Sequence, residues 1–319
     1  MTTKQALVTA IIPTYNMGVC IGDAIQSALA QTYSNLEVLV VDDGSTDNTP
    51  EVVAEFGNRV TYLTQANAGQ GAARNLAIRR SRGEFVAFLD ADDIWRPTKI
   101  ERQMALAAEA GVAVVGCGYT VQDMTGNIEF DRVIRRNFDD PKIFVDLMSI
   151  CQLLPGSGSG VLAAKACFER VGDFDVTLRF AQDWDMWLRL VQHYEARFVE
   201  EVLVVIRKNN LKPAFRTQSN EQRFVSMVID KNVPKELRPR SYAALHARLG
   251  SNSLALGDYR GAAHHLATSI RLKPTRIFPL DPGGRYRLPN TPRYYLLAKS
   301  LLGILTGKGK PPAGAPNRP

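Results

Sequence analysis

The sequence predicts an α/β fold: a Rossmann-like, mostly parallel sheet with helices on both faces, followed by an α-helical region. Over roughly the first 120 residues, short runs of Val, Ile and Leu alternate with segments of helical periodicity. Polar clusters follow several of these apolar runs, and ligands bind beyond the carboxyl ends of strands in open sheets. After about residue 215 only helical patterns remain.

Five apolar runs are predicted to form strands, and four segments with helical spacing or helix-start residues are predicted to connect them. The strands are Leu7–Ile12, Leu36–Val41, Val60–Leu63, Phe85–Leu89 and Val112–Tyr119. The helices are 21–29, 49–56, Gln70–Arg80 and Pro97–Ala110. Because strands that alternate with helices usually run parallel, both faces of the sheet should be covered.

Length and composition favour three parts. We predict an α/β domain at 1–212, a helical region at 213–306, and a disordered tail at 307–319 that is rich in Gly, Pro and Lys. The net charge of +7 and the pI near 9.3 permit binding to nucleic acid, anionic lipid or phosphorylated substrates. No aromatic–basic strand motif or recognition-helix pattern accompanies this charge, so we predict no nucleic-acid partner.

The cysteines and the apolar runs bear on the compartment. Cys20, Cys117, Cys151 and Cys167 show no C-x-x-C spacing and are interpreted as buried thiols of a reducing compartment. The first apolar run is too short for a cleavable leader, and no run approaches the ~20 apolar residues of a spanning helix. We therefore expect a cytoplasmic protein whose basic C-terminal region can meet the inner face of a membrane.

Two carboxylates, Asp90 and Asp92, follow the apolar run Phe85–Leu89 at its carboxyl end. Acidic side chains in this position repel each other unless a cation lies between them and their target. A hard divalent cation whose shell is completed by substrate phosphates satisfies this requirement. The alternative is an acidic cluster at the start of the helix that Pro97 begins.

Two further polar clusters favour the first interpretation. The segments Pro13–Asn16 and Asp42–Ser45 also follow predicted strands, so three clusters should meet at one edge of the sheet. The chain has neither the G-x-G-x-x-G of a dinucleotide site nor the G-x-x-x-x-G-K-[ST] of a P-loop. The phosphates of a ligand must then be neutralised by a metal ion and by side chains.

Four segments resemble, in order and spacing, the signature blocks of family 2 glycosyltransferases. They are Ile11–Asn16, Val40–Asp47, Asn67–Asn75 and Phe88–Asp93, and the resemblance covers about residues 5 to 210. It implies a GT-A fold, Mg²⁺ or Mn²⁺ as cofactor, and inverting transfer from a nucleotide-diphosphate sugar, most commonly a UDP-sugar. The implied acceptor is a hydroxyl of a glycan or of a lipid-linked glycan.

The resemblance also implies roles for individual residues. Asp43 would accept a hydrogen bond from the base, Asp90 would approach the ribose, and Asp92 would hold the metal against the diphosphate. Arg74, on the helix that begins at Gln70, could donate two hydrogen bonds to phosphate oxygens, unless it is only a solvated helix charge. The complete implied nucleotide-sugar site consists of Pro13, Thr14, Tyr15, Asp43, Asn67, Gly71, Arg74, Asp90, Ala91 and Asp92.

A second region, Gly172–Asp175 followed by Ala181–Leu190, resembles the acceptor-side segment of the same family. Inverting transfer needs one carboxylate to take the proton of the acceptor hydroxyl as its oxygen attacks the anomeric carbon. Asp183 matches the position of this base, although the family more often has Glu where this chain has Gln182. Asp185 is the rival, but on a helix it would point ~200° away from Asp183, so only one of them can face the sugar.

The surroundings of this region carry two further expectations. Trp184, Trp187, Leu188 and Val191 are predicted to form the core face of the helix rather than a sugar-stacking surface. The segment Leu154–Gly160, rich in Gly and Ser, is predicted to form a flexible wall on the acceptor side, before a helix near Lys165.

In the helical region, the stretch 243–276 resembles one tetratricopeptide repeat, with Gly250 and Ala262 at the close-packing positions. A single repeat cannot bury its own faces, so it should pack on the α/β domain or on the helix near Gln222–Ile229. A protein partner could also bind there. The four histidines, His193, His246, His264 and His265, lack the spacing of metal ligands, and we predict solvated helix positions for them.

One other function class remains open, a catalytically inactive GT-A-like scaffold whose helical region recruits a partner. The presence of Asp43, Asp92 and Asp183 argues against it.

Overall fold

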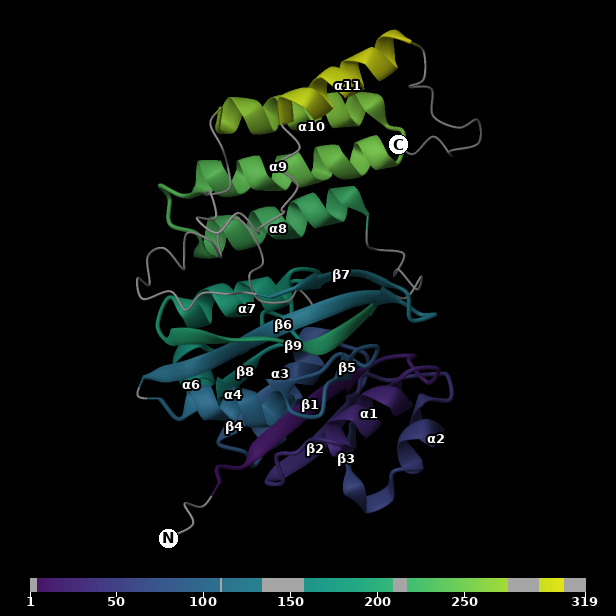
Figure 1. Cartoon of the computed structure of the whole chain (residues 1–319), viewed down its shortest axis with the longest axis vertical. Coiled ribbons are helices and arrows are strands. Elements are labelled where there is room, and N and C mark those ends of the chain that lie inside the picture. The colour runs from purple at the N-terminus through teal and green to yellow at the C-terminus, as the bar shows by residue number, and fades with distance from the viewer. Residues whose placement is uncertain (1–4, 110, 134–157, 209–216, 275–292, 307–319) are drawn as a thin grey trace. The chain divides into compact units, whose positions relative to one another are not determined.

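A computed structural model describes residues 5–109, 111–133, 158–208, 217–274 and 293–306. The described residues form two compact units, one up to residue 208 and one from residue 217 (Figure 1). The predicted disordered tail lies outside the described residues. Within them, no helix has the length and apolar character that crossing a membrane would require.

The first unit is built on one sheet, whose described strands follow the order β3-β2-β1-β4-β8-β6-β9-β5, with β7 paired to β6 (Figure 1). The strands are β1 Val8–Thr14, β2 Leu36–Asp42, β3 Thr61–Thr64, β4 Phe85–Phe88, β5 Ile94–Trp95, β6 Val112–Asp123, β7 Ile128–Arg132, β8 Leu162–Ala164 and β9 Glu195–Lys208. The five predicted strands are all present, which confirms the α/β fold class.

The sheet is parallel in one half and mixed in the other. Strands β3, β2, β1 and β4 are mutually parallel, as the alternation with helices predicted. Beyond β4, β8 runs antiparallel to both of its neighbours, β6 and β9 are parallel, and β5 pairs antiparallel with β9. The mostly parallel arrangement therefore describes the first half, because the sequence pattern did not reveal the short strands β5 and β8.

Helices connect these strands: α1 Ile21–Leu29, α2 Thr49–Ala54, α3 Gln70–Arg80, α4 Lys99–Ala107, α6 Cys167–Val171 and α7 Gln182–Val191. Helix α4 was predicted to begin at Pro97 but begins at Lys99, because Pro97 and Thr98 form a turn after β5. The helix expected near Lys165 begins at Cys167.

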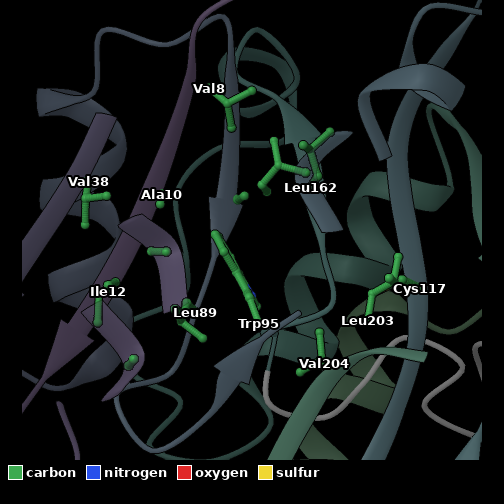
Figure 2. Packing of buried hydrophobic residues seen from close by; sticks show 14 of the residues in the cluster. Val8, Ala10, Ile12, Val38, Leu89, Trp95, Cys117, Leu162, Leu203 and Val204 are labelled. Atoms are coloured by element: carbon green, nitrogen blue, oxygen red, sulfur yellow. The ribbon is translucent and has the colours of Figure 1, made fainter. Parts of the chain in front are cut away.

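The central strands fix the edge at which the polar clusters lie. Every residue of β1 is buried, and Val8, Ala10 and Ile12 point into one hydrophobic cluster (Figure 2). Trp95 packs in the same cluster, and its Nε1 donates a hydrogen bond to the Ser159 carbonyl at 2.8 Å. Burial on this scale makes the strand ends rigid supports for the loops that follow them.

Three of the four cysteines belong to this packed interior. Cys20, Cys117 and Cys167 are buried free thiols, as predicted, and Cys151 lies outside the described residues. Burial raises the pKa of each described thiol to about 11, so they are unreactive at neutral pH.

The second unit is a stack of helices in which α8, α9, α10 and α11 follow one another (Figure 1). They span Gln218–Asn232, Arg238–Ala255, Tyr259–Leu272 and Arg293–Leu305. A Cβ on Gly250 would lie 2.7 Å from Cγ of Leu266, so this glycine lets α9 and α10 approach closely. Ala262 is fully buried in the same contact.

Two histidines of this unit are not solvated, so our prediction is wrong for them. His246 and His265 are half-buried, and their Nδ1 atoms lie 3.0 Å apart between α9 and α10. Burial, and then the neighbouring histidines, lower the pKa of both rings. Their sequence spacing gave no signal because the pairing depends on how two helices cross.

Candidate active site

The predicted polar clusters meet at the carboxyl edge of β1, β2 and β4. The backbone N–H of Asp43 donates to the Thr14 carbonyl, which ties the end of β2 to the end of β1. The turn after β1 is fixed further, because Asn16 donates to the Ser45 hydroxyl at 2.8 Å and accepts from the Thr46 N–H at 2.7 Å. The two loops therefore form one hydrogen-bonded layer at this edge.

The end of β1 presents three of the predicted nucleotide-site residues in different ways. Pro13 and Thr14 are buried within the strand, and Tyr15 is 45% exposed just beyond it. Such an exposed ring on a rigid support can stack on a nucleobase. Thr14 Oγ1 is buried and has no hydrogen-bond partner among the described residues.

Asp43 holds a loop. Its Oδ1 accepts hydrogen bonds from Gln65 Nε2 at 2.7 Å and the Ala68 N–H at 2.8 Å, and its Oδ2 accepts from the Gly69 N–H at 2.7 Å. These bonds shape the segment 65–69 that leads into α3, where the predicted site residue Asn67 is exposed. A carboxylate oxygen can accept two hydrogen bonds, so Oδ2 keeps room for a base N–H. The anchoring role was not foreseen from the sequence.

Asp90 is the centre of a buried polar group. Its Oδ1 accepts from Arg74 Nη2 at 2.7 Å and from Gln70 Nε2 at 2.9 Å. Arg74 is 1% exposed, and its guanidinium lies over the Phe174 ring at 5.4 Å, so it is not a solvated helix charge. The backbone N–H of Asp90 donates to the hydroxyl of Ser159.

Like charges surround this carboxyl group. Burial, and then the charges of Asp92 and Asp183, raise the pKa of Asp90 to about 7, although Arg74 acts in the opposite direction. Three carboxylates from two distant parts of the chain thus lie near enough to influence one another. Proximity of this kind is a characteristic of ligand and metal sites.

The residues fit a metal that is only partly held by protein. No three His, Cys, Asp or Glu side chains in the described parts of the chain are grouped as a complete metal site. Mg²⁺ and Mn²⁺ at nucleotide sites are commonly bound by one or two carboxylates, with phosphate oxygens and water as the other ligands. The mutual repulsion of Asp90 and Asp92 is the observation that favours a cation here.

Arg207 of β9 fixes the turn that carries Asp92. Its Nε donates to the Asp92 carbonyl at 2.5 Å, its backbone N–H donates to Asp93 Oδ1, and its Nη1 pairs with Asp23 of α1 at 2.6 Å. Ser159 holds the other side of this turn, because its hydroxyl donates to Asp93 Oδ2. Arg207 was not predicted as a site residue, and Ser159 was predicted only as part of the acceptor-side wall 154–160; both lie far from Asp92 in the chain.

Asp183 enters the site from the first turn of α7. It is 7% exposed, and its Oδ1 accepts from the N–H of Trp184 at 2.8 Å. The preceding Ala181 has φ +60°, a conformation that costs free energy for a residue with a Cβ. Gln182 donates to Gln70 Oε1 at 2.9 Å and so links the start of α7 to the start of α3.

Asp185, the rival base, is fully buried and used for structure. It accepts from Arg189 Nε and Nη2 at 3.0 and 2.8 Å. Arg189 in turn donates to the carbonyls of Val171 and Asp173. This arrangement favours Asp183 as the carboxylate that faces a substrate, and the catalytic role itself stays a prediction.

The aromatic side chains of α7 belong to the core, which confirms that prediction. Trp184, Trp187, Leu188 and Val191 are all buried. The Trp187 ring makes edge contacts with Phe88 and Phe174, at centroid distances of 5.5 and 6.0 Å. The Arg74 guanidinium packs on this aromatic cluster through the Phe174 ring.

The predicted flexible wall is wrong for the part that the structure describes. Residues 158–160 are buried, and those before them lie outside the described residues. A Cβ on Gly158, which has φ +71°, would lie 3.3 Å from Arg74 Nη2. The glycine therefore lets the chain pass close to Arg74. Gly71, at the start of α3, is buried against the segment 174–182.

Comparisons with known proteins agree with this geometry. The model of glycosyl transferase family 2 matches residues 9–158. The Escherichia coli protein WfgD, named as a UDP-Glc:α-D-GlcNAc-diphosphoundecaprenol β-1,3-glucosyltransferase, is 32% identical over 58% of this chain and 70% of its own length. An uncharacterised glycosyltransferase of Rickettsia typhi is 32% identical over 64% of this chain, which spans 65% of that relative.

Solved structures share the fold. Residues 1–349 of Staphylococcus aureus TarS, crystallised with UDP, superpose with a TM-score of 0.60 at 18% identity, covering 98% of this chain and 93% of TarS 1–349. The mannosyltransferase PcManGT from Pyrobaculum calidifontis, in complex with GDP-Man and Mn²⁺, gives 0.54 at 22% identity, covering 96% and 89%. The fold is that of GT-A glycosyltransferases. The chain belongs to glycosyl transferase family 2.

Proposed function

We propose that the chain transfers a sugar from a nucleotide-diphosphate sugar, with UDP as the preferred nucleotide, to a hydroxyl of a glycan or lipid-linked glycan. The observation that supports this proposal is the contact of Asp90 with the buried Arg74 at the carboxyl edge of the sheet, within the electrostatic influence of Asp92 and Asp183. The nucleotide sugars named for WfgD and PcManGT, and the UDP bound to TarS, support the donor class.

On the donor side, Tyr15 would stack on the base and Asp43 would accept a hydrogen bond from it. Asp92 would hold Mg²⁺ or Mn²⁺ against the diphosphate, and Arg74 would keep Asp90 in place near the ribose. The metal would neutralise the charge that develops on the leaving diphosphate. Asn67, Gly71 and Ala91 would line the same pocket through their backbone.

On the acceptor side, Asp183 would take the proton of the hydroxyl while its oxygen attacks the anomeric carbon. The bond between that carbon and the nucleotide diphosphate breaks in the same step, so the configuration inverts once and no covalent enzyme intermediate forms. The buried pairing of Asp185 with Arg189 excludes it from this role in the proposal.

The remaining proposals concern location and partners. We place the protein in the cytoplasm, with a lipid-linked acceptor at the inner face of the membrane and no nucleic-acid partner. The helical hairpin of α9 and α10, in which we retain the tetratricopeptide resemblance as a proposal, could bind a protein. The inactive scaffold stays the second candidate, and the carboxylates at the sheet edge argue against it.

Binding and turnover with a panel of donors test the proposal. The full chain should be stabilised against thermal unfolding by UDP together with Mn²⁺, and less by either alone, because ligands that bind only the folded state raise its stability. Release of UDP from UDP-sugars should depend on the metal and rise when acceptor is added. Stabilisation without any turnover of any donor would favour the scaffold, and no stabilisation by any nucleoside diphosphate would contradict the site.

A further inference from the structure

The net positive charge of the chain is confined to its C-terminal end. Of the 39 Lys and Arg and the 32 Asp and Glu in the chain, 10 and 1 lie in residues 261–319, which leaves 29 and 31 in the first 260 residues. The greater part of the chain is thus slightly acidic, and the basic pI comes from the segment that contains most of α10 and all of α11. Neither helix contains an acidic residue.

Helix α11 presents a continuous apolar face outward. Its exposed residues recur at the spacing of one helix face, and all of them are uncharged except Lys299, which lies at the edge of that face. The large ones range from 48% exposed at Leu301 to 83% at Leu305. The outer face of α11 consists of Tyr294, Tyr295, Ala298, Leu301, Leu302 and Leu305.

The opposite face of α11 is fixed to α10. Ser300 and Gly303 are buried there, and a Cβ on Gly303 would lie 2.1 Å from Cδ1 of Tyr259. Arg293 Nη1 donates to the Ser269 carbonyl of α10 at 2.8 Å. Helix α11 is the last layer of the stack in Figure 1, so its orientation is set by these contacts. The apolar residues therefore point away from α10 in a packed helix.

We infer that the outer face of α11 is a docking surface for an anionic lipid bilayer. Its side-chain hydrogen-bonding groups are the phenols of Tyr294, which donates to the Pro274 carbonyl at 3.1 Å, and of Tyr295; tyrosine rings suit the boundary between headgroups and hydrocarbon. The exposed cation Lys299 lies on α11 at the edge of this face, and Arg271 is exposed near the end of α10. A helix with large apolar side chains on one side and Lys or Arg beside them lies in the plane of a membrane surface.

This inference does not rest on the proposed transferase activity, and it can be tested without a donor or an acceptor. The full chain should float with vesicles that contain phosphatidylglycerol, and bind much less to vesicles of phosphatidylcholine alone. Each basic residue near an anionic surface strengthens binding about fivefold, so added salt should release the protein.

Two variants and one matched control locate the surface. Replacement of Leu302 and Leu305 by Ser should weaken binding to phosphatidylglycerol vesicles at least about tenfold, because both side chains would enter the acyl boundary. Lys299→Glu should weaken the same binding roughly tenfold and reduce its salt dependence. Leu256→Ser alters a leucine that is 75% exposed at the end of α9, outside the surface, and should bind like the wild type.

Several outcomes would overturn the inference. One is that the wild-type chain fails to bind either vesicle. Another is that the double Leu variant binds as the wild type does. Analytical ultracentrifugation supplies the third: if the wild type is a dimer without vesicle binding and the double Leu variant is a monomer, the surface is covered by a second copy and not by lipid. Circular dichroism and thermal unfolding confirm that each variant is folded.

Discussion

Two acidic pairs occupy equivalent places in the fold, and the structure uses them differently. Asp42 ends β2 and Asp43 follows it, and Asp90 and Asp92 follow β4, so both pairs lie at the carboxyl edge of parallel strands. Asp42 accepts from the Ser45 N–H and the Tyr62 hydroxyl, and Asp43 accepts three hydrogen bonds from the loop 65–69. The first pair is therefore surrounded by neutral donors from nearby loops.

The second pair is surrounded by charge. Asp90 is held by Arg74, and burial, followed by the charges of Asp92 and Asp183, raises its pKa to about 7. Neutral donors bonded to a carboxylate shape a loop, whereas carboxylates that repel one another gain free energy when a cation enters. Acidic motifs that look alike in the sequence therefore differ in function according to the groups that their carboxylates contact. Asp183 and Asp185, two residues apart on α7, repeat the contrast.

The largest effect should come from the α7 pair. Asp183→Asn should leave binding of UDP and Mn²⁺ intact but lower the transfer rate by ~10²–10⁴-fold, the usual loss when general-base assistance is removed. Asp185→Asn should instead lower the stability by roughly 3 kcal/mol, because Arg189 would keep a buried charge without its partner. The rate per folded molecule and the free energy of unfolding separate the two. Equal rate losses, or a greater one at Asp185, would mean that the wrong carboxylate was chosen.

Asp92→Asn tests the proposal that Asp92 binds the metal ion. The variant should lose the metal-dependent part of nucleoside-diphosphate binding while its thermal unfolding changes little, because Asp92 is held through its backbone by Arg207. Titration calorimetry with UDP, with and without Mn²⁺, measures this. Asp173→Asn, at an exposed surface ion pair with Arg79, is the matched control and should bind as the wild type does. Unchanged Mn²⁺ dependence in Asp92→Asn would remove the metal assignment.

Asp43→Ala tests whether the hydrogen bonds that Asp43 accepts from the loop 65–69 are needed for donor binding. Three hydrogen bonds that shape 65–69 are lost, so the donor's KM should rise by about tenfold or more while kcat falls less, since base binding is the same in the ground and transition states. Amide hydrogen exchange at Ala68 and Gly69 should speed up, which a residue that only contacted the base would not cause. Tyr62→Phe removes one bond to Asp42 and should alter neither measurement by more than a fewfold. A pure kcat defect at Asp43 would contradict its place on the donor side.

The strands and polar clusters could be predicted because their signals are local. An apolar run followed by Asp or Asn identifies a strand and its carboxyl end, as for β1, β2 and β4. The residues that fix the site are not local to it: Ser159 and Arg207 reach the turn of Asp92 and Asp93 from 66 and 115 positions away. Their sequence neighbourhoods have no pattern that anticipates this, because the contact exists only once β9 and the segment before β8 have joined the sheet.

The burial and the contacts of individual charged side chains also could not be predicted from the sequence. Arg74 could have been solvated or buried, and the decision depends on Phe174, which lies 100 positions further along the chain. The same holds for Asp183 and Asp185, where helical geometry predicted that they point apart but not which one meets the site. The pairing of Asp185 with Arg189, which also donates to the carbonyls of Val171 and Asp173, favours Asp183, and these groups come together only in the folded unit.

The smallest expected effect concerns Gln182, which stands where glycosyl transferase family 2 more often has Glu. Its amide donates to Gln70, whose own amide donates to Asp90, so a neutral side chain links the two acidic regions. Gln182→Glu adds a negative charge beside Asp183 and Asp90, and a nearby like charge raises the pKa of a carboxyl group. Because the base must be ionised, the acid limb of the kcat/KM profile should move to higher pH, by roughly half a unit. Gln192→Glu, at the other end of α7, adds the same charge at an exposed position and should leave the profile in place. A shift in the opposite direction, or the same shift in both variants, would show that the pH dependence does not arise from the carboxylates at this site.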